Sequence, residues 1–363
     1  MIISISKPDF LLVAEREELD LPKRWNGHDF HDELKLLFET YEFILSNYIS
    51  RADIRKVRSI CNGLLKCIEQ YHNGFPYKAF RKMDDIMKKL MLYPVKIYKK
   101  SGWTDAFEQH DPLMLFRIRN VLNNTNYYRK DIFHTPYNLR SLISSFRYSI
   151  SGYPSLYLST SLELCCEESK VNSLDDLTIA SRFKIERNLH NNNGMEIDVI
   201  ELAVKLKDFV NNYRDINENM RASNTIFKKR TFNEVDLSNI DVMSSYLYWY
   251  PLIAACSFIR VNKNYPFASE YIIPQLLMQW IRSQFKNQKL IGIRYFSCAS
   301  ESASELGFNY IFPASGEKDS KYKEYCEILS RSFTLTDPIF IHEFFSVEYC
   351  ERILKLATNF HKI

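Results

Sequence analysis

Apolar residues in the first ninety positions recur every three or four residues, which is the period of an amphipathic helix. The first predicted helix has one apolar face, made by Leu34, Leu37, Phe38, Tyr41, Ile44, Leu45 and Tyr48. A second helix is predicted from Asp53 to the Asn73-Gly74 pair, and Pro76 begins a third as its first-turn proline. The pattern predicts an all-helical domain at residues 1–100, followed by a linker at 101–112.

From residue 113 onward, strand-like and helix-like segments follow one another without a regular β-α-β order. Strands are predicted at 113–119, 156–158, 183–186, 197–202, 291–296 and 339–345. Three helices are predicted: one that begins at Leu162, one with Pro274 in its first turn, and one at 347–360. Residues 246–258 are apolar enough to form a buried element. The charged residues 204–240 are predicted to be an insertion of loops and short helices. The fold class is therefore predicted to be α+β, with a mixed sheet in one domain at 113–363.

One stretch, residues 146–169, combines a turn, a strand and the start of a helix. Ser151-Gly152-Tyr153-Pro154 is typical of a turn, and Ser159-Thr160-Ser161 offers hydroxyl caps to the helix that follows. Arg147 precedes the turn, and Glu167 and Glu168 fall on the second helical turn. The stretch is either a core hairpin with a solvated pair of glutamates or part of a charged site.

The composition is that of a globular protein, and it excludes several function classes. Hydrophobic residues make up 46% of the 363 positions and charged residues 25%, with a net charge of +4. This small net charge does not indicate a nucleic-acid partner. Glycine occurs only nine times, and neither the dinucleotide-binding nor the P-loop glycine motif is present.

The eight cysteines and the apolar runs indicate the expected compartment. No two cysteines form a C-x-x-C pair, so no metal site is expected, and reduced, buried thiols are predicted. The apolar run at residues 10–14 is too short for a signal peptide, and no run approaches the ~18 residues of a membrane span. We therefore expect a cytoplasmic protein without a membrane partner.

Five features at fixed spacing resemble the RES domain, a family named for an arginine, a glutamate and a serine. They are Arg117 in LMLFRIR, Arg147 in FRYS, the turn after it, Tyr157 in LYLSTS, and Glu168 eleven residues after that tyrosine. Glu167 is the reserve choice for the glutamate. The segments SEYIIPQLLMQWIRS (269–283) and KLIGIRYFS (289–297) are similar to the helix and strand that close the RES fold.

The RES resemblance implies an ADP-ribosyltransferase-like fold that consumes NAD⁺. It implies a catalytic role for Glu168 beneath the ribose, together with Arg117. Arginine side chains suit the pyrophosphate, which adds Arg147, and Tyr157 would border the nicotinamide. Arg140, at the end of the polar loop 120–140, is expected to help hold a phosphorylated ligand. No metal is implied.

The family serine has two candidates, because the pattern departs from the family near Pro274. Ser269 is ranked ahead of Ser297. The acceptor is also open: water gives a NAD⁺ glycohydrolase, phosphate a phosphorylase, and a protein side chain a mono-ADP-ribosyltransferase, for which Glu167 or Glu163 could be the second acid. A non-catalytic RES-like scaffold is the competing interpretation.

The first 100 residues resemble the HEPN-like helical domains found before some RES domains. The resemblance lies in residues 71–83, where the end of a helix, an Asn-Gly pair, a proline and a second helix follow one another. The HEPN nuclease pattern of Arg and His fits Arg24 with His31, but it also fits Arg129 with His134. We therefore favour a structural or sensing role for this domain over a nuclease. A toxin or antiphage effector fits NAD⁺ consumption, with an antitoxin bound through the N-terminal domain and a second copy of the chain as expected partners.

Overall fold

The computed structural model describes residues 3–92, 115–123, 125–171, 177–185, 197–221, 237–262, 264–284, 290–314, 323–341, 347–356 and 359–363. The chain divides into two compact units. Unit 1 comprises Met1–Trp103 with Val204–Trp280, and unit 2 comprises Thr104–Ala203 with Ile281–Ile363. This division differs from the predicted single domain at 113–363, because residues 204–280 pack with the N-terminal helices. The predicted linker at 101–112 lies outside the described residues.

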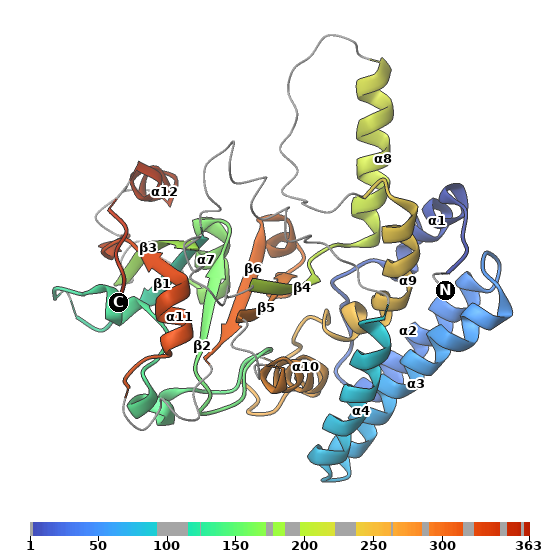
Figure 1. The fold of residues 1–363 in the computed structure, drawn as a ribbon, viewed down its shortest axis with the longest axis horizontal. Coiled ribbons are helices and arrows are strands. Elements are labelled where there is room, and N and C mark those ends of the chain that lie inside the picture. Colours follow the sequence, from blue (N-terminus) through green and yellow to red (C-terminus); the bar gives the residue numbers. More distant parts are fainter. Residues whose placement is uncertain are drawn as a thin grey trace, which may run out of the picture. The chain divides into compact units, whose positions relative to one another are not determined.

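Unit 1 is helical (Figure 1). Its elements are α1 Lys7–Ala14, η1 Glu17–Leu19, α2 Phe30–Leu45, α3 Arg51–His72, α4 Pro76–Leu90, α8 Leu206–Arg221, α9 Ile240–Ala255, η3 Ser269–Tyr271 and most of α10 Ile272–Ser283. The three predicted N-terminal helices are confirmed, although α2 ends three residues before Tyr48. Helix α8 has 16 residues, so the prediction of loops and short helices at 204–240 was wrong over this part. Residues 222–236 of that segment lie outside the described residues.

Helix α9 forms the centre of unit 1. All but three of its 16 residues are buried, as expected for a helix that is apolar on every side. Its backbone and its tyrosines also bond the surrounding elements. The Tyr41 hydroxyl of α2 donates to the Leu247 carbonyl at 2.7 Å, and the Tyr250 hydroxyl donates to the Leu19 carbonyl at 2.8 Å. Because these donors are buried and satisfied, they fix α9 against its neighbours.

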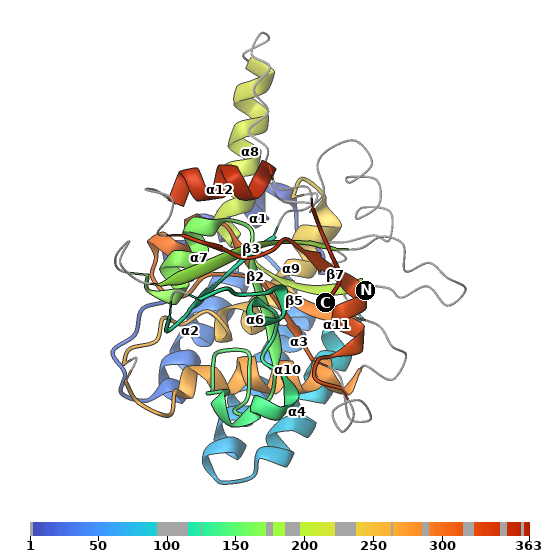
Figure 2. The same cartoon turned by 90° about the vertical axis from the view of Figure 1, so that its left-hand side faces the viewer.

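Unit 2 contains a mixed sheet (Figures 1 and 2), and this sheet has eight strands within the described residues. The strands are β1 Leu115–Asn120, β2 Ser155–Ser159, β3 Thr178–Ile185, β4 Ile197–Leu202, β5 Leu290–Phe296, β6 Phe308–Pro313, β7 Phe333–Leu335 and β8 Ile339–Phe340. The order is β4-β5-β6-β2-β1-β3-β7, and β8 also pairs with β3. Strands β4 and β5 are parallel, and the other pairs are antiparallel. The predicted mixed sheet is confirmed.

Two apolar clusters cover the sheet of unit 2. The larger contains Leu156, Leu158 and Phe312 from the strands and Leu329 from α11 Glu327–Ser332. The second joins Phe116 of β1 to α7 Leu162–Ser169 and α12 Val347–Leu356, and α12 packs against α7 (Figure 2). Short helices α6 Arg129–Ile132, η2 Tyr137–Leu142 and η5 Ser302–Glu305 complete the described part. Because side chains alternate along a strand, odd-numbered and even-numbered positions of β2 point to opposite faces.

Candidate functional site

Helix α7 is held at its start by β6 and the turn before it. Ser161 caps the helix by accepting a hydrogen bond from the Leu164 N–H at 3.1 Å, and its hydroxyl donates to the Leu306 carbonyl at 2.8 Å. The Thr160 N–H donates to the Phe308 carbonyl at 2.9 Å, and the Phe308 N–H donates to the Thr160 Oγ1 at 2.8 Å. These bonds determine where the second turn of α7, with its glutamates, lies.

Glu168 of α7 receives two hydrogen bonds on one carboxylate oxygen. Ser297 Oγ donates to Oε1 at 2.6 Å, and Asn309 Nδ2 donates to the same Oε1 at 2.7 Å. Hydrogen bonds to a carboxylate are shorter and stronger than neutral ones. Both donors are buried, whereas Glu168 itself is exposed. The carboxylate is therefore fixed from inside the protein while it stays open to a ligand.

A second layer of hydrogen bonds orients the two donors. Ser159 Oγ donates to Asn309 Oδ1 at 2.5 Å, across the register pair that these residues form between β2 and β6. The Ala299 N–H donates to Ser297 Oγ at 3.1 Å, which directs the serine proton toward Glu168. The sheet thus orients the side chains that orient the carboxylate.

Tyr295 connects Glu168 to the predicted nucleotide-binding residues. Burial raises the pKa of Tyr295 well above its ordinary value; Glu168 and Tyr157 add to this rise, and Arg147 opposes it. The three side chains therefore lie within electrostatic range of one hydroxyl. The Tyr295 ring packs against Tyr148, with ring centroids 4.6 Å apart.

Arg147 lies in a tight turn over these tyrosines. Phe146 and Ser149 close the turn with two backbone hydrogen bonds of 3.1 and 3.2 Å. The Phe146 ring meets the Tyr157 ring edge-on at 6.2 Å, and the buried Tyr148 holds the turn against Tyr295. The turn therefore presents Arg147 beside Tyr157 and Tyr295.

Arg117 lies where β1 meets β2, which pair at Phe116 and Ser159. Its Nη1 donates to the Tyr157 carbonyl at 2.9 Å, and its buried Nε has no hydrogen-bond partner among the described residues. Burial lowers the pKa of Arg117 to about 9, and neighbouring Arg119 contributes to the lowering. The side chain still carries its charge at neutral pH, so an anion beside it would be favourable.

The pKa of Cys165 on α7 responds to both Arg117 and Glu168. Burial raises the pKa of this thiol to about 12; a hydrogen bond to Ser159 and the charge of Arg117 oppose the rise, while Glu168 adds to it. Arg117 therefore contacts the backbone of β2 at Tyr157, whereas Arg147, Tyr157 and Glu168 lie around Tyr295, and Ser297 bonds Glu168.

Two predicted residues belong to other elements of the chain. Ser269 belongs to η3 of unit 1, and the serine that bonds Glu168 is Ser297. Arg140 of η2 donates to the Gly152 carbonyl at 3.4 Å, just before β2 begins. Ser159 is at the other end of β2, so at ~3.3 Å per residue Arg140 contacts a part of the chain roughly 20 Å along the strand from Ser159.

The other glutamates of α7 are exposed and differ in their contacts. Glu167 Oε1 accepts a hydrogen bond from Ser300 Oγ at 3.3 Å. Glu163 lies in the first turn of α7, one turn before Glu167. Glu167 is thus near the loop that follows Ser297, and Glu163 offers a matched exposed carboxylate on the same helix.

Sequence reasoning missed Asn309, Ser159 and Tyr295. Tyr295 lies two residues before Ser297, inside the segment that carries the family resemblance, so its position was a usable signal. Asn309 has no such local signal, because its contact with Glu168 joins positions 141 residues apart. Only the pairing of β2 with β6 brings Asn309 to the carboxylate.

The Arg and His residues that fit the nuclease pattern have structural partners. His134 is buried; its Nε2 accepts from the Cys326 N–H at 2.9 Å, so Nδ1 carries the proton and donates to the Thr135 carbonyl at 2.9 Å. Arg129 forms an ion pair with Asp337 at 3.5 Å. In unit 1, His31 is in the first turn of α2, and Arg24 precedes that helix.

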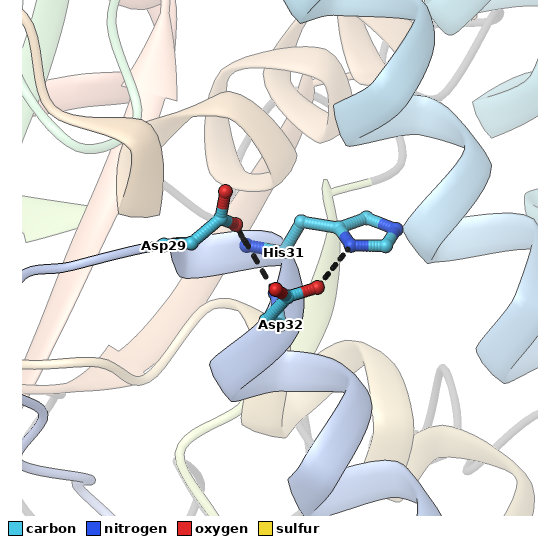
Figure 3. A group of neighbouring side chains, drawn as sticks. All are labelled: Asp29, His31 and Asp32. Carbon is cyan, nitrogen blue, oxygen red and sulfur yellow. Dashed lines mark hydrogen bonds and ion pairs between the residues drawn. The ribbon is translucent and has the colours of Figure 1, made fainter.

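Asp29, His31 and Asp32 are a further group with potential metal ligands (Figure 3). Asp29 caps α2 by accepting from the His31 and Asp32 N–H groups at 2.8 and 3.2 Å, and His31 Nδ1 lies 3.2 Å from Asp32 Oδ1. Helix capping accounts for this arrangement, so we assign no metal site to it. All eight cysteines are free; seven of them are buried, as predicted, and Cys166 is half-buried.

The chain is similar to a known bacterial protein. The chain is 27% identical over 344 residues to a protein of Bacillus subtilis (strain 168) named "Putative toxin YopC". The matched residues cover 89% of this chain and 69% of the relative. No family model and no solved structure matches the chain. Among the residues that the structure describes, no helix is long and apolar enough to cross a membrane.

Proposed function

We propose that this protein is a toxin that cleaves NAD⁺ at the bond between nicotinamide and ribose. The observation that carries the proposal is Glu168, whose Oε1 is fixed by Ser297 and Asn309 while the residue stays exposed. A carboxylate held in this way is pre-oriented for a substrate that develops positive charge. The arrangement fits the RES-like order of residues and supports an ADP-ribosyltransferase-like fold for unit 2.

The chemistry assigns a role to each neighbouring side chain. Cleavage sends the electron pair of the C1′–N bond to the nicotinamide, and positive charge develops on the ribose as in a glycosidase. Glu168 stabilises this charge through Oε2, because Oε1 is occupied by its two donors. Arg117 and Arg147 bind the pyrophosphate, and Tyr157 borders the nicotinamide.

The acceptor completes the reaction by forming a new C1′–O bond. Water would lose a proton to solvent and yield ADP-ribose, and inorganic phosphate would yield the 1″-phosphorylated product. Either reaction drains a cofactor that every cell needs, which suits a toxin. The relative's name supports this role, and an antitoxin that binds the protein follows as its expected regulator.

One observation favours a second candidate, mono-ADP-ribosyl transfer to a protein. Glu167 is exposed next to Glu168 and is bonded to Ser300. A second acidic residue at this place could accept the proton of a protein nucleophile. The two candidates share Glu168 and differ in whether Glu167 is needed.

The test is nicotinamide release from NAD⁺ by the purified protein, with and without phosphate. Glu168→Gln should reduce the rate at least 100-fold, because removing one electrostatic stabiliser typically costs about 10²–10³. Glu163→Gln is the matched control and should keep the rate. Dependence on added phosphate identifies the phosphorylase. Nicotinamide release at the same rate from wild type and Glu168→Gln, or from neither, would refute the assignment and favour a non-catalytic scaffold.

A further inference from the structure

Four aromatic side chains are exposed in unit 1, near the turn that joins α3 to α4. Phe75 and Tyr77, at the start of α4, are 42% and 60% exposed. Tyr265 and Phe267, in the segment before η3, are 64% and 51% exposed. We call these four residues the aromatic patch. Exposed apolar side chains that gather on one surface mark interaction sites, whereas single ones are common on any protein.

The end of α3 joins the two sides of the aromatic patch. The Phe267 ring lies 6.3 Å from the Tyr71 ring, nearly parallel to it, and 6.3 Å from the His72 ring. The Phe75 N–H donates to the Gln70 carbonyl at 2.9 Å, which folds the chain back over the same last turn of α3. Phe75 and Phe267 therefore lie at one end of this helix, although they are far apart in the sequence.

Basic side chains hold both sides of the aromatic patch in place. The Lys78 ammonium lies 4.0 Å from the centroid of the Phe75 ring and 6.0 Å from that of the Tyr77 ring. On the other side, Arg260 Nη2 donates to the Tyr265 carbonyl. Aromatic side chains that are already held in place lose less freedom when a partner binds.

The segments that form the aromatic patch are basic. Residues 70–83 and 257–269 contain lysines and arginines but no aspartate or glutamate. Lys78 and Arg81 are exposed, and neither forms an ion pair with a carboxylate of the described residues. The patch therefore combines apolar rings with positive charges that a partner can reach.

The carboxylates that flank these segments leave the positive charge largely uncompensated. Glu69 and Asp84 each form an ion pair with a lysine of their own helix at 2.6 Å, and Glu270 is buried. Asp85 is exposed, but within the described residues it forms no ion pair with Arg81. The surface around the aromatic patch thus keeps an excess of positive charge.

We propose that the aromatic patch binds an acidic segment of a partner protein. Carboxylates of that segment pair with Lys78 and Arg81, and its apolar side chains cover the rings. Tyr77 and Arg81 are four positions apart on α4, so they lie on one side of the helix and a single segment can contact both. Aromatic and arginine side chains are also those that most often dominate binding at interfaces.

A protein segment fits the aromatic patch better than a nucleic acid does. Base stacking uses open ring faces. Lys78 covers one face of the Phe75 ring, and Tyr71 partly covers one face of the Phe267 ring. The net charge of only +4 also lacks the basic excess that is typical of nucleic-acid-binding proteins.

Fluorescence anisotropy with three dye-labelled polymers tests the proposal on the whole chain. Poly(Glu,Tyr) supplies carboxylates and rings, polyglutamate supplies carboxylates alone, and poly(Lys,Tyr) reverses the charge. We expect poly(Glu,Tyr) to bind wild type at least tenfold more tightly than either of the other polymers, because only this polymer matches both the rings and the cations.

Substitutions in the aromatic patch should weaken the binding of poly(Glu,Tyr). We expect a loss of at least tenfold for Tyr77→Ser and Phe267→Ser, which remove rings, and for Lys78→Glu, which reverses a charge. All three side chains are exposed, so the thermal midpoint should stay near that of wild type.

Two exposed residues near the other end of α3 provide matched controls. Phe43→Ser, on α2, removes a ring that is 74% exposed, and Arg55→Glu reverses a charge on α3. Because α3 has 22 residues, its start lies roughly 30 Å from the end that carries the aromatic patch. Both control variants should bind poly(Glu,Tyr) as wild type does.

The outcomes separate the aromatic patch from the proposed activity, since the patch belongs to unit 1 and the Glu168 network to unit 2. Patch-dependent binding of poly(Glu,Tyr) without nicotinamide release would support the patch and refute the activity. If wild type binds poly(Glu,Tyr) no more tightly than polyglutamate, or if the three patch variants bind as wild type does, the proposal is overturned.

Two other occupants of the aromatic patch would also overturn the proposal. One is a single-stranded oligonucleotide that binds more tightly than poly(Glu,Tyr) and is lost in the patch variants. The other is a second copy of the chain, which light scattering would reveal as a dimer that dissociates in Tyr77→Ser and Phe267→Ser but not in Phe43→Ser.

Discussion

Ser297 Oγ donates a 2.6 Å hydrogen bond to Glu168 Oε1 across 129 positions of sequence. The serine directly follows β5, and the glutamate lies near the end of α7, so two separate elements meet at one oxygen atom. A carboxylate fixed in this way loses less freedom when a ligand binds. Of the two candidate serines, Ser297 is the one whose hydroxyl is seen to bond Glu168.

Removing the donors to Glu168 should reduce the rate without preventing folding. For Ser297→Ala and Asn309→Ala we expect kcat for nicotinamide release to fall about tenfold or more each, since hydrogen bonds to charged groups contribute about 1.5–3 kcal/mol. KM should change little, because the donors contact Glu168 and not the pyrophosphate site. Steady-state kinetics measure both values. A rise in KM alone would contradict the positioning role.

Asn309→Asp separates positioning from packing. This variant keeps the shape of the side chain but replaces the donor to Glu168 with a second carboxylate, which repels the first. We expect a larger loss of rate than in Asn309→Ala, with a similar thermal midpoint for the two variants. A wild-type rate in Asn309→Asp would show that Asn309 acts only by filling space.

Gly307→Ala should disturb the start of α7. Gly307 has a φ of +140°, and an added Cβ would clash with Thr160 Oγ1. Both effects loosen the bonds between Thr160 and Phe308 that place α7. We expect a lower free energy of unfolding by about 1–3 kcal/mol, measured by urea denaturation, together with slower nicotinamide release. Gly74→Ala, where an added Cβ meets no atom within 4 Å, is a control for the cost of the positive φ alone.

The buried ion pair between Glu201 and Arg294 should be sensitive to single substitutions. Both side chains are 1% exposed, Nη1 lies 2.6 Å from Oε2, and the guanidinium carbon lies 3.9 Å from the centroid of the Phe308 ring. Glu201→Leu or Arg294→Met alone leaves an unpaired buried charge, which typically costs about 3–5 kcal/mol. We expect the double variant to recover much of this loss. Urea denaturation of all four proteins gives the coupling energy, and strictly additive losses would contradict the pairing.

His134 should make unit 2 sensitive to mild acid. Burial lowers its pKa from 6.5 to about 4; Arg117 and Arg119 contribute to the lowering, and the Thr135 carbonyl opposes it. The unfolded chain therefore binds a proton that the folded chain does not, between pH 6.5 and 4. The stability from the neutral ring is fully present above pH 6.5 and is lost as the pH falls toward 4.

We expect the free energy of unfolding to fall by about 2 kcal/mol between pH 7 and pH 5 because of His134 alone. His134→Gln should be less stable at pH 7 but should lose less stability over this range. Urea denaturation at both pH values measures the difference, and His28→Gln, at an exposed histidine, is the control. A fall that is equal in wild type and His134→Gln would rule out this role.

Local patterns predicted much of the fold, because single elements carry their own signals. The Asn73-Gly74 stop, the Pro76 start and the hydroxyls before Leu162 each mark a helix end that the structure has at that place. The short strand at 156–158 is the centre of β2. These signals depend on capping and turn conformations within a few residues.

The division into units and the network around Glu168 depend on contacts that no local pattern encodes. Helix α9 was recognised as buried, but its partners Tyr41 and Leu19 lie more than two hundred positions away. Glu168 was predicted from spacing, whereas Asn309 enters the site only through strand pairing. The ranking of Ser269 before Ser297 rested on its closeness to a helix in sequence, and the hydrogen bond follows the strand instead.

Unit 1 is formed by residues that precede strands β1–β4 in the sequence and by residues that follow them. This order has a consequence for synthesis of the chain on the ribosome. A ribosome completes Glu168 and β4, then the whole of 204–280, before it reaches Ser297 and Asn309. A nascent chain that is released early therefore contains the carboxylate without the donors that fix it. Under the proposed function, fragments from stalled synthesis would not release nicotinamide, and the activity would begin only once Ser297 and Asn309 have been added and folded.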